Sequence, residues 1–265
     1  MAYSIIALDI DGTLLNDDHK LTPRVIAAVR SAAEQGAEIV LCTGRGSSSA
    51  LPVLNELGMQ GTMITHNGSS IVDSATRSVI YEMAIEPELA NRYQSYLRER
   101  QIHFDMNTSF ELYVDSLPED IAAMYERFHV LPVVRSPEDA LPAGTVKLSV
   151  YAPSSVLDEL ERDWTDWAHD LQTIRSGDFF IDIQHPHATK GKALERLAAM
   201  RGVARERILA IGNYYNDIGM LSFAGFGIAM DNSPAEVKAE ADEATASNNE
   251  DGVALALERH VLSNG

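Results

Sequence analysis

The sequence has little cysteine, few basic residues, and no apolar run long enough to cross a membrane. Its one cysteine, Cys42, cannot form an internal disulfide, which favours a reducing compartment. The 21 lysines and arginines stand against 39 aspartates and glutamates, which gives a formal charge of −18. That field repels nucleic acid and anionic membrane surfaces. We therefore expect a cytoplasmic protein without nucleic-acid or membrane partners, in which any bound phosphate is held by local cations, a metal or backbone amides.

The N-terminal segment of the chain carries two closely spaced carboxylates. The apolar run 5–8 leads directly into Asp9, Ile10, Asp11 and Gly12. A short apolar run that ends in a glycine turn predicts an interior strand of a parallel sheet, and ligands of such sheets gather at the carboxyl ends of strands. Alternate residues of an extended chain point the same way, so both carboxylates are placed to face one ligand. One is suited to attack phosphorus and the other to move a proton, although acidic residues also end strands without any such role.

The segment that follows has the pattern of a strand–helix–strand unit. Thr22 and Pro23 are typical of a helix start, Gly36 ends that helix, and the apolar run 37–42 predicts a second strand with Cys42 buried at its end. Parallel strands joined by one helix make a right-handed crossover. We therefore expect the residues after position 42 to lie beside Asp9.

The pattern changes in the middle of the chain and then returns. Strand–helix alternation resumes at Lys190, so we predict a parallel-sheet core formed by residues 1–81 and 186–265, with an inserted α+β domain at 82–185. Trp164 and Trp167 stand at helical spacing and indicate packing inside the insert. The elements expected there are a helix with Leu89, Tyr93 and Leu97, a hairpin of 102–105 with 110–114, a helix at 121–128, a loop at 132–142, a strand at 146–151, a helix with Leu157 and Leu160, and a strand at 179–183.

Four loops at predicted strand or helix ends carry polar residues that suit one phosphate. They hold Asp9 with Asp11, Thr43 with Gly44 and Arg45, Lys190, and Asn213 with Asn216 and Asp217. With these residues in this order and at this spacing, the chain resembles the haloacid dehalogenase (HAD) superfamily phosphatases, specifically the Cof-like group with a type IIB cap. The resemblance covers nearly the whole chain and implies a Rossmann-like α/β core, an inserted cap domain and magnesium-dependent hydrolysis of phosphate monoesters.

The resemblance also implies a role for each matching residue. Asp9 would be the nucleophile that becomes an aspartyl phosphate, Asp11 the general acid and base, and Lys190 the cation that neutralises charge shared by Asp9 and the phosphoryl group. Phosphate would be held by the Ile10 amide, Thr43, Gly44, Arg45, Lys190 and Asn216. The Mg²⁺ ligands would be Asp9, Asp11 through its carbonyl, Asn213 and Asp217.

The fourth loop departs from the family pattern. Where the family has Gly-Asp-x-x-Asn-Asp, this chain has an amide at the second position, Asn213. An amide carbonyl is still a hard oxygen ligand, but one negative charge is lost from the metal site. At an effective dielectric of about 20, unit charges about 4 Å apart interact by about 4 kcal/mol, so the loss weakens metal binding. Asp217 would compensate through a bound water or by direct ligation.

The function predicted from these residues is phosphatase activity on small phosphorylated metabolites, either sugar phosphates or phosphorylated cofactors. Two alternatives stay open from the sequence alone. One is a phosphomutase of similar architecture, and the other is a phosphate-ligand sensor in which Asn213 has weakened turnover. The sequence does not identify the substrate, because the residues that select it lie in the cap, to which no motif transfers, and it does not determine the oligomeric state.

The departure at position 213 gives a direct prediction. Activity persists in the natural protein, and an Asn213→Asp variant reaches half-maximal rate at a lower Mg²⁺ concentration, because a carboxylate adds charge to the ligand set. Phosphatase rates measured across a magnesium titration check this. Superimposable titrations for the two proteins would contradict it.

Overall fold

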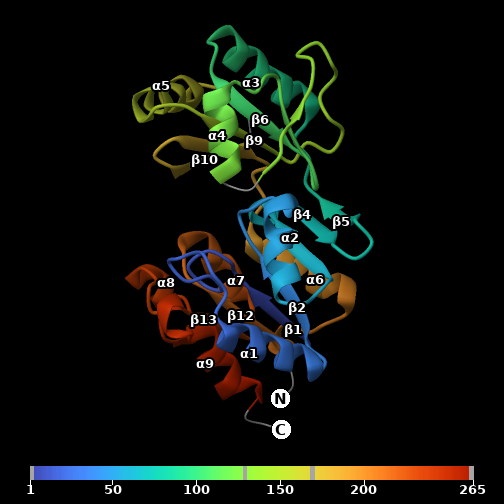
Figure 1. The fold of residues 1–265 in the computed structure, drawn as a ribbon, viewed down its shortest axis with the longest axis vertical. Coiled ribbons are helices and arrows are strands. Elements are labelled where there is room, and N and C mark those ends of the chain that lie inside the picture. Colours follow the sequence, from blue (N-terminus) through green and yellow to red (C-terminus); the bar gives the residue numbers. More distant parts are fainter. Residues whose placement is uncertain (1–2, 128–129, 168–170, 263–265) are drawn as a thin grey trace. The chain divides into compact units, whose positions relative to one another are not determined.

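The structure, a computed structural model, describes residues 3–127, 130–167 and 171–262 (Figure 1). These residues form two compact units, one from residues 1–80 with 189–265 and one from residues 81–188. The predicted fold class, an α/β parallel-sheet core with an inserted α+β domain, is confirmed. Within the described residues, no helix combines the length and apolar composition needed to span a membrane.

The first unit is built on a largely parallel sheet. Strand β1 pairs in parallel with β12 on one side and β2 on the other, with Leu8 beside both Ile211 and Leu41. All four residues of β1 are buried, as expected for a strand covered on both faces. The strands lie in the order β14 (Glu243–Ala244), β13 (Phe226–Ala229), β12 (Ile208–Gly212), β1 (Ile5–Leu8), β2 (Glu38–Cys42), β3 (Thr62–Thr65), β4 (Ser70–Asp73) and β5 (Ser78–Glu82).

The helices of the first unit start and stop where local chemistry dictates. The Thr22 hydroxyl accepts a hydrogen bond from the Val25 amide at 3.2 Å and begins α1, and Gly36, at φ +93°, follows its end. Thr189 caps α6 in the same way. The helices are α1 (Pro23–Glu34), α2 (Ser47–Glu56), α6 (Lys190–Arg201), α7 (Ile218–Phe223), α8 (Ala235–Ala239) and α9 (Gly252–His260), with short 3₁₀ turns at His66–Gly68, Arg205–Arg207, Tyr215–Asp217 and Asn248–Glu250.

The second unit has its own sheet, in which most strands are antiparallel. Helices α3 (Pro87–Glu99) and α5 (Ser154–Thr165) contribute to an apolar cluster with one sheet face, and α4 (Glu119–Arg127) contributes to a second cluster with Val114. The strands lie in the order β10 (Gln172–Gly177), β11 (Phe180–Gln184), β9 (Lys147–Tyr151), β6 (His103–Asn107), β7 (Leu112–Val114) and β8 (Val133–Val134). The predicted hairpin is the antiparallel pair β6 and β7.

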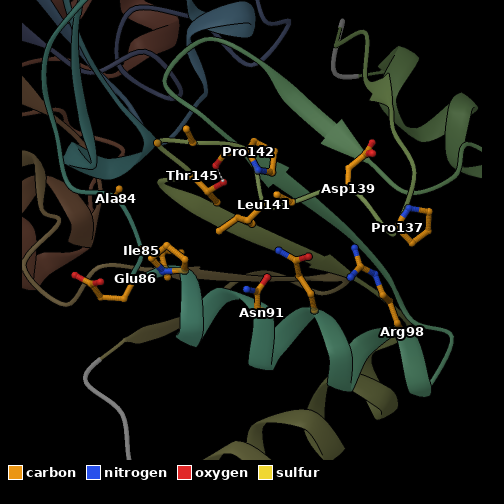
Figure 2. Close-up of a pocket in the computed structure, with 15 residues that line it drawn as sticks. Ala84, Ile85, Glu86, Asn91, Arg98, Pro137, Asp139, Leu141, Pro142 and Thr145 are labelled. Carbon is orange, nitrogen blue, oxygen red and sulfur yellow. Dashed lines mark hydrogen bonds between the residues drawn. The ribbon is translucent and has the colours of Figure 1, made fainter.

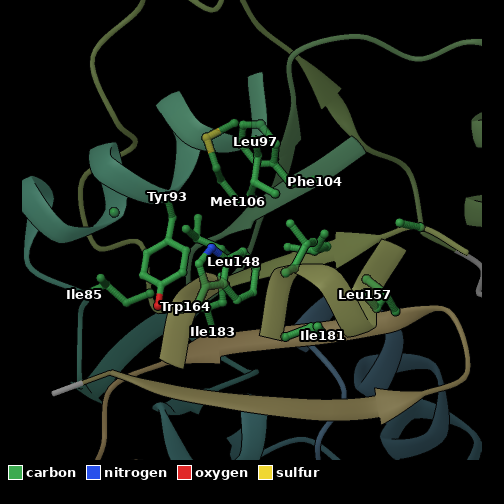
Figure 3. Close-up of a cluster of buried hydrophobic side chains, with 14 residues drawn as sticks. Ile85, Tyr93, Leu97, Phe104, Met106, Leu148, Leu157, Trp164, Ile181 and Ile183 are labelled. Carbon is green, nitrogen blue, oxygen red and sulfur yellow. The ribbon is translucent and has the colours of Figure 1, made fainter. Parts of the chain in front are cut away.

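Aromatic packing holds the helices of the second unit together (Figure 3). Trp164 is 3% exposed, and its ring meets the ring of Tyr93 edge to face at 4.9 Å. Trp167 lies 4.9 Å from the same tyrosine ring, beyond the end of α5. The prediction that both tryptophans pack inside the insert is confirmed.

The other sheet face of the second unit is polar although it is buried. On β6 the apolar Phe104 and Met106 alternate with polar side chains, of which Asp105 is 5% exposed. The Tyr125 hydroxyl of α4 donates to Asp105 at 2.9 Å, and burial raises the pKa of that carboxyl to about 6. This hydrogen bond ties α4 to the polar face.

Several elements differ from the sequence prediction. The predicted loop at 132–142 contains the short strand β8, and strands β4, β5 and β10 were not predicted. β10 reads Gln-Thr-Ile-Arg-Ser-Gly and lies at an edge of its sheet, so it lacks the apolar alternation that marks half-buried strands. The predicted helix at 121–128 starts two residues earlier, at Glu119, and its last predicted residue lies outside the described part of the chain.

A pocket of about 540 Å³ opens within the second unit, between α3 and the loop before β9 (Figure 2). Gln94 of α3 lines it and is 3% exposed, yet its Nε2 atom has no hydrogen-bond partner among the described residues. The other lining residues are Ala84, Ile85, Glu86, Pro87, Asn91, Arg98, Pro137, Asp139, Ala140, Leu141, Pro142, Ala143, Gly144 and Thr145. A buried amide without a partner lowers stability, because it has lost its hydrogen bonds to water.

The unpaired amide yields a prediction about stability. A Gln94→Met variant, which keeps the shape of the side chain, raises the free energy of unfolding by about 1 kcal/mol, equivalent to a Tm increase of about 2–4 °C. Gln184→Met is the matched control, because Gln184 is also buried but its Nε2 donates to the Ala188 carbonyl at 3.0 Å. Thermal melts of both variants test this, and equal losses of Tm would contradict it.

Candidate active site

The candidate site lies at the carboxyl edge of the parallel sheet. Asp9 follows β1, and its amide donates to the Ile211 carbonyl of β12 at 3.0 Å. Thr43 follows β2, and Asn213 follows β12. The pairing of β1 with both neighbouring strands therefore gathers three of the four predicted loops, as a parallel sheet requires.

A buried lysine joins the first and fourth loops. Lys190 is the first residue of α6 and is 1% exposed. Its Nζ atom lies 2.6 Å from Asp9 Oδ1 and 2.6 Å from Asp217 Oδ1. Burial by itself disfavours the ammonium, but the two carboxylates outweigh it and raise the pKa of Lys190 above its ordinary value. The lysine is therefore held as a cation beside Asp9.

Opposing influences act on the pKa of Asp9. Burial and the neighbouring Asp217 raise the pKa of Asp9 to about 7, against the opposing influence of Lys190 and of the Ile10 amide. Its other oxygen, Oδ2, accepts a hydrogen bond from the Thr13 hydroxyl at 3.1 Å. A carboxylate that is 5% exposed and held at both oxygens has a fixed orientation.

Asp217 holds the backbone of the fourth loop in place through hydrogen bonds. Its Oδ2 atom accepts hydrogen bonds from the backbone amides of Asn213 at 2.8 Å and Tyr214 at 3.0 Å, while its Oδ1 atom contacts Lys190. A Cβ on Gly212 would lie 2.6 Å from Asp217 Cγ, so only glycine lets the strand pass this carboxylate. Both oxygens of Asp217 are engaged, and direct ligation of a metal would require it to release Lys190.

The side chain of Asn213 enters a group of oxygen atoms. Its Oδ1 position lies 3.1 Å from Asp9 Oδ2, 2.9 Å from the Asp11 carbonyl oxygen and 3.1 Å from Thr13 Oγ1. Within the described residues, no three His, Cys, Asp or Glu side chains form a metal-binding group. The hard donors gathered here are instead one carboxylate oxygen, one backbone carbonyl and one amide.

Asp11 and Arg45 form a paired unit at the mouth of the site. The guanidinium donates from Nε at 2.8 Å and from Nη2 at 2.5 Å to the two oxygens of Asp11, whose side chain is 50% exposed. This hydrogen bonding raises the pKa of Arg45. The two-point contact fixes both side chains in one plane.

The second loop is tied to the fourth loop through Asn67. Thr43 is buried, and its hydroxyl accepts a hydrogen bond from the Arg45 amide at 3.0 Å. A Cβ on Gly44 would lie 3.1 Å from the Asn67 side chain. Asn216 donates to Asn67 Oδ1 at 2.9 Å. The structure thus brings together the predicted residues of all four loops.

Sequence reasoning missed two residues that shape the site. Thr13 contacts both Asp9 and Asn213, and Asn232 donates to the Gly12 carbonyl at 2.8 Å. Thr13 directly follows the glycine of the acidic turn, a signal that was present but not used. Asn232 follows β13 on a loop that carries no recognisable motif, so no local pattern points to it.

The cysteine and the local charge bear on the chemistry. Cys42 is the last residue of β2 and is fully buried, as predicted, and burial raises the pKa of its thiol, which disfavours the reactive thiolate. Around Asp9, three carboxylates face two cationic side chains, which leaves one net negative charge. Binding of a phosphate dianion here calls for added positive charge.

Comparisons with known proteins agree with this geometry. Residues 6–257 match the family of haloacid dehalogenase-like hydrolases. A Bacillus subtilis protein named "Putative phosphatase YxeH" is 32% identical over 98% of this chain and 99% of its own length. The 5-amino-6-(5-phospho-D-ribitylamino)uracil phosphatase YwtE of the same organism is 27% identical over 96% of both chains.

A solved structure shows the same fold over nearly the whole chain. The HAD subclass IIB sugar phosphatase BT4131 superposes with a TM-score of 0.80 at 25% identity, covering 97% of this chain and 98% of that one. The family match, the relatives and this fold bear out the resemblance read from the sequence. The chain belongs to the haloacid dehalogenase-like hydrolases, and it is an enzyme of the phosphoric monoester hydrolase class.

Proposed function

We propose that this enzyme is a Mg²⁺-dependent phosphatase that hydrolyses small phosphorylated metabolites through an aspartyl phosphate on Asp9. Sugar phosphates and phosphorylated cofactors or their precursors are the substrate classes, in keeping with the named activities of BT4131 and YwtE. The observation that carries the proposal is the buried contact of Lys190 with Asp9 at 2.6 Å. The inserted domain, residues 82–185, would be the cap, and a cytoplasmic location stays a prediction from composition.

Asp9 is suited to attack because its orientation is held and its charge is supported. In the first step one carboxylate oxygen of Asp9 bonds to phosphorus as the bond from phosphorus to the leaving oxygen breaks. The leaving oxygen takes a proton from Asp11. In the second step a water oxygen bonds to phosphorus and gives its proton to Asp11, and the bond to Asp9 breaks to release inorganic phosphate.

Asp11 must exchange partners to transfer protons. Its two oxygens both accept hydrogen bonds from Arg45. A phosphate dianion arriving at the site would compete for the same guanidinium, because Arg binds phosphate by the same two-point contact. We assign Arg45 to phosphate binding, and with it the Ile10 amide, Thr43, Gly44, Lys190 and Asn216.

The donor set fits a Mg²⁺ ion. Magnesium prefers hard oxygen ligands such as carboxylates, carbonyls and water. The Asn213 Oδ1 position lies 2.9 Å from the Asp11 carbonyl oxygen and 3.1 Å from Asp9 Oδ2. These three groups would hold the ion, with Asp217 contributing through a bound water. When bound, Mg²⁺ supplies positive charge that offsets repulsion between Asp9 and the phosphate.

Phosphate release from a generic aryl phosphate, followed by a panel of phosphorylated metabolites with Mg²⁺, tests the proposal. Turnover with different kcat/KM values across the panel supports it. Retained metabolite binding without phosphate release at saturating Mg²⁺ would point instead to a sensor. A positional phosphate isomer formed without net release would point to a phosphomutase.

Removal of the nucleophile gives the first prediction of this mechanism. Asp9→Asn lowers kcat by at least about 10⁴-fold, the scale seen when a covalent nucleophile is lost, because an amide cannot form the aspartyl phosphate. Stopped assays with the aryl phosphate measure this, and an unchanged far-ultraviolet spectrum shows that the fold is kept. An Asp9→Asn enzyme that retained a tenth of the rate would contradict the mechanism.

Arg45 gives the second prediction. Arg45→Ala lowers kcat/KM by about tenfold to a hundredfold, because the phosphate loses a charged two-point contact worth about 1.5–3 kcal/mol. Arg24→Ala is the matched control, since Arg24 makes the same two-point contact with Glu258 on the protein surface. Steady-state kinetics of both variants check the prediction. Equal effects, or none for Arg45→Ala, would show that the pairing with Asp11 is only structural.

A further inference from the structure

The Asn213 amide stands among atoms that accept hydrogen bonds. The end of the amide that points inward is 3.1 Å from Asp9 Oδ2 and 2.9 Å from the Asp11 carbonyl oxygen, neither of which carries a proton to share when Asp9 is ionised. The Thr13 hydroxyl, also 3.1 Å away, is the one neighbour of this end able to donate or accept.

The orientation of the amide decides whether its inward atom can form hydrogen bonds with the atoms around it. With Oδ1 inward, the oxygen meets two other oxygens that only accept hydrogen bonds. With Nδ2 inward, after a 180° rotation, the nitrogen lies within hydrogen-bond distance of all three groups. An amide nitrogen among oxygen acceptors is favoured, and an amide oxygen in the same place is favoured only when a cation shares the group.

We propose that the Asn213 amide is a two-position element that competes with Mg²⁺. In the metal-free protein with Asp9 ionised, the nitrogen points inward and its N–H groups bind Asp9 and the Asp11 carbonyl. In the metal-bound protein the amide is rotated and its oxygen points to the ion. This inference rests on the proposed function, because it concerns the same metal site.

The competition weakens metal binding beyond the effect of the missing charge. Metal binding must displace existing hydrogen bonds. The apparent affinity for Mg²⁺ is therefore the intrinsic affinity multiplied by the fraction of molecules whose amide already presents its oxygen. An aspartate at this position has no N–H to offer and would place another anionic oxygen beside Asp9. Asparagine therefore stabilises the metal-free site and makes the enzyme respond to magnesium at higher concentrations.

Glycine at position 12 leaves room for the outer half of the amide. A Cβ on Gly12 would lie 2.4 Å from Nδ2 and 3.1 Å from Cγ of Asn213. Gly12 also has φ +73°, a conformation that side chains rarely adopt. The turn that carries the two aspartates thus leaves space on the outer side of the Asn213 amide.

Thermal melts in EDTA and in Mg²⁺ measure how much the Asn213 amide stabilises the metal-free and the metal-bound protein. In EDTA, Asn213→Asp lowers the Tm by about 2–4 °C, the equivalent of one lost buried hydrogen bond in a chain of this size. With Mg²⁺ the same variant gains more Tm than the natural protein does. The charge control is Asn232→Asp, which adds the same charge beside Gly12 and loses the hydrogen bond to the Gly12 carbonyl. Asn213→Asp gains more Tm with Mg²⁺ than Asn232→Asp does, and equal gains would show that charge alone accounts for the effect and overturn the two-position element.

The side-chain NH₂ resonance of Asn213 in ¹⁵N-labelled protein reports the rotation directly, and its absence in Asn213→Asp identifies it. In EDTA its protons exchange slowly with water, and saturation with Mg²⁺ shifts the resonance and speeds exchange. An unchanged resonance in protein whose Tm does rise with Mg²⁺ overturns the two-position element but leaves the phosphatase intact. Loss of both the Tm response and phosphate release overturns the proposed function as well.

Discussion

The ion pair between buried Lys190 and two aspartates is the interaction on which the rest of the site depends. A lysine that is 1% exposed is tolerated only because Asp9 and Asp217 each lie 2.6 Å from it. Removing one partner of such a group leaves an uncompensated buried charge, which costs about 3–5 kcal/mol. Lys190 is the first residue of α6, directly after the Thr189 cap, so the start of this helix is held beside Asp9. Two segments far apart in sequence are thereby locked to the end of β1.

Around this fixed pair, the two sides of Asp9 have different chemistry. Oδ1 faces the permanent charge of Lys190, whereas Oδ2 faces Thr13 and the amide of Asn213. On the first side, the buried Lys190 supplies a permanent positive charge. On the second side, the proposed Mg²⁺ would bring the positive charge, in competition with the Asn213 amide.

The second unit combines one strongly apolar sheet face with one polar face. The apolar face carries the cluster around Tyr93 and Trp164, which gives the unit a core of its own. On the polar face, Asp105 and Asp182 are buried and are held by hydroxyl groups of Tyr125 and Ser149. The alternation of side chains along the strands thus gives the sheet one apolar face and one face on which buried carboxylates lie beside the smaller apolar cluster of Val114 and α4.

The sequence by itself determined the strands that lead into Asp9, Thr43 and Asn213, because buried parallel strands read as short apolar runs ending in turns. It also marked the inserted unit, through the change of pattern. Only the tertiary structure decided which polar side chains touch: that Asp11 pairs with Arg45, and that Asp217 engages both Lys190 and its own loop. The contacts of Asp11 with Arg45 and of Asp217 with Lys190 join segments far apart in sequence, and local pattern carries no information about side-chain orientation across that separation.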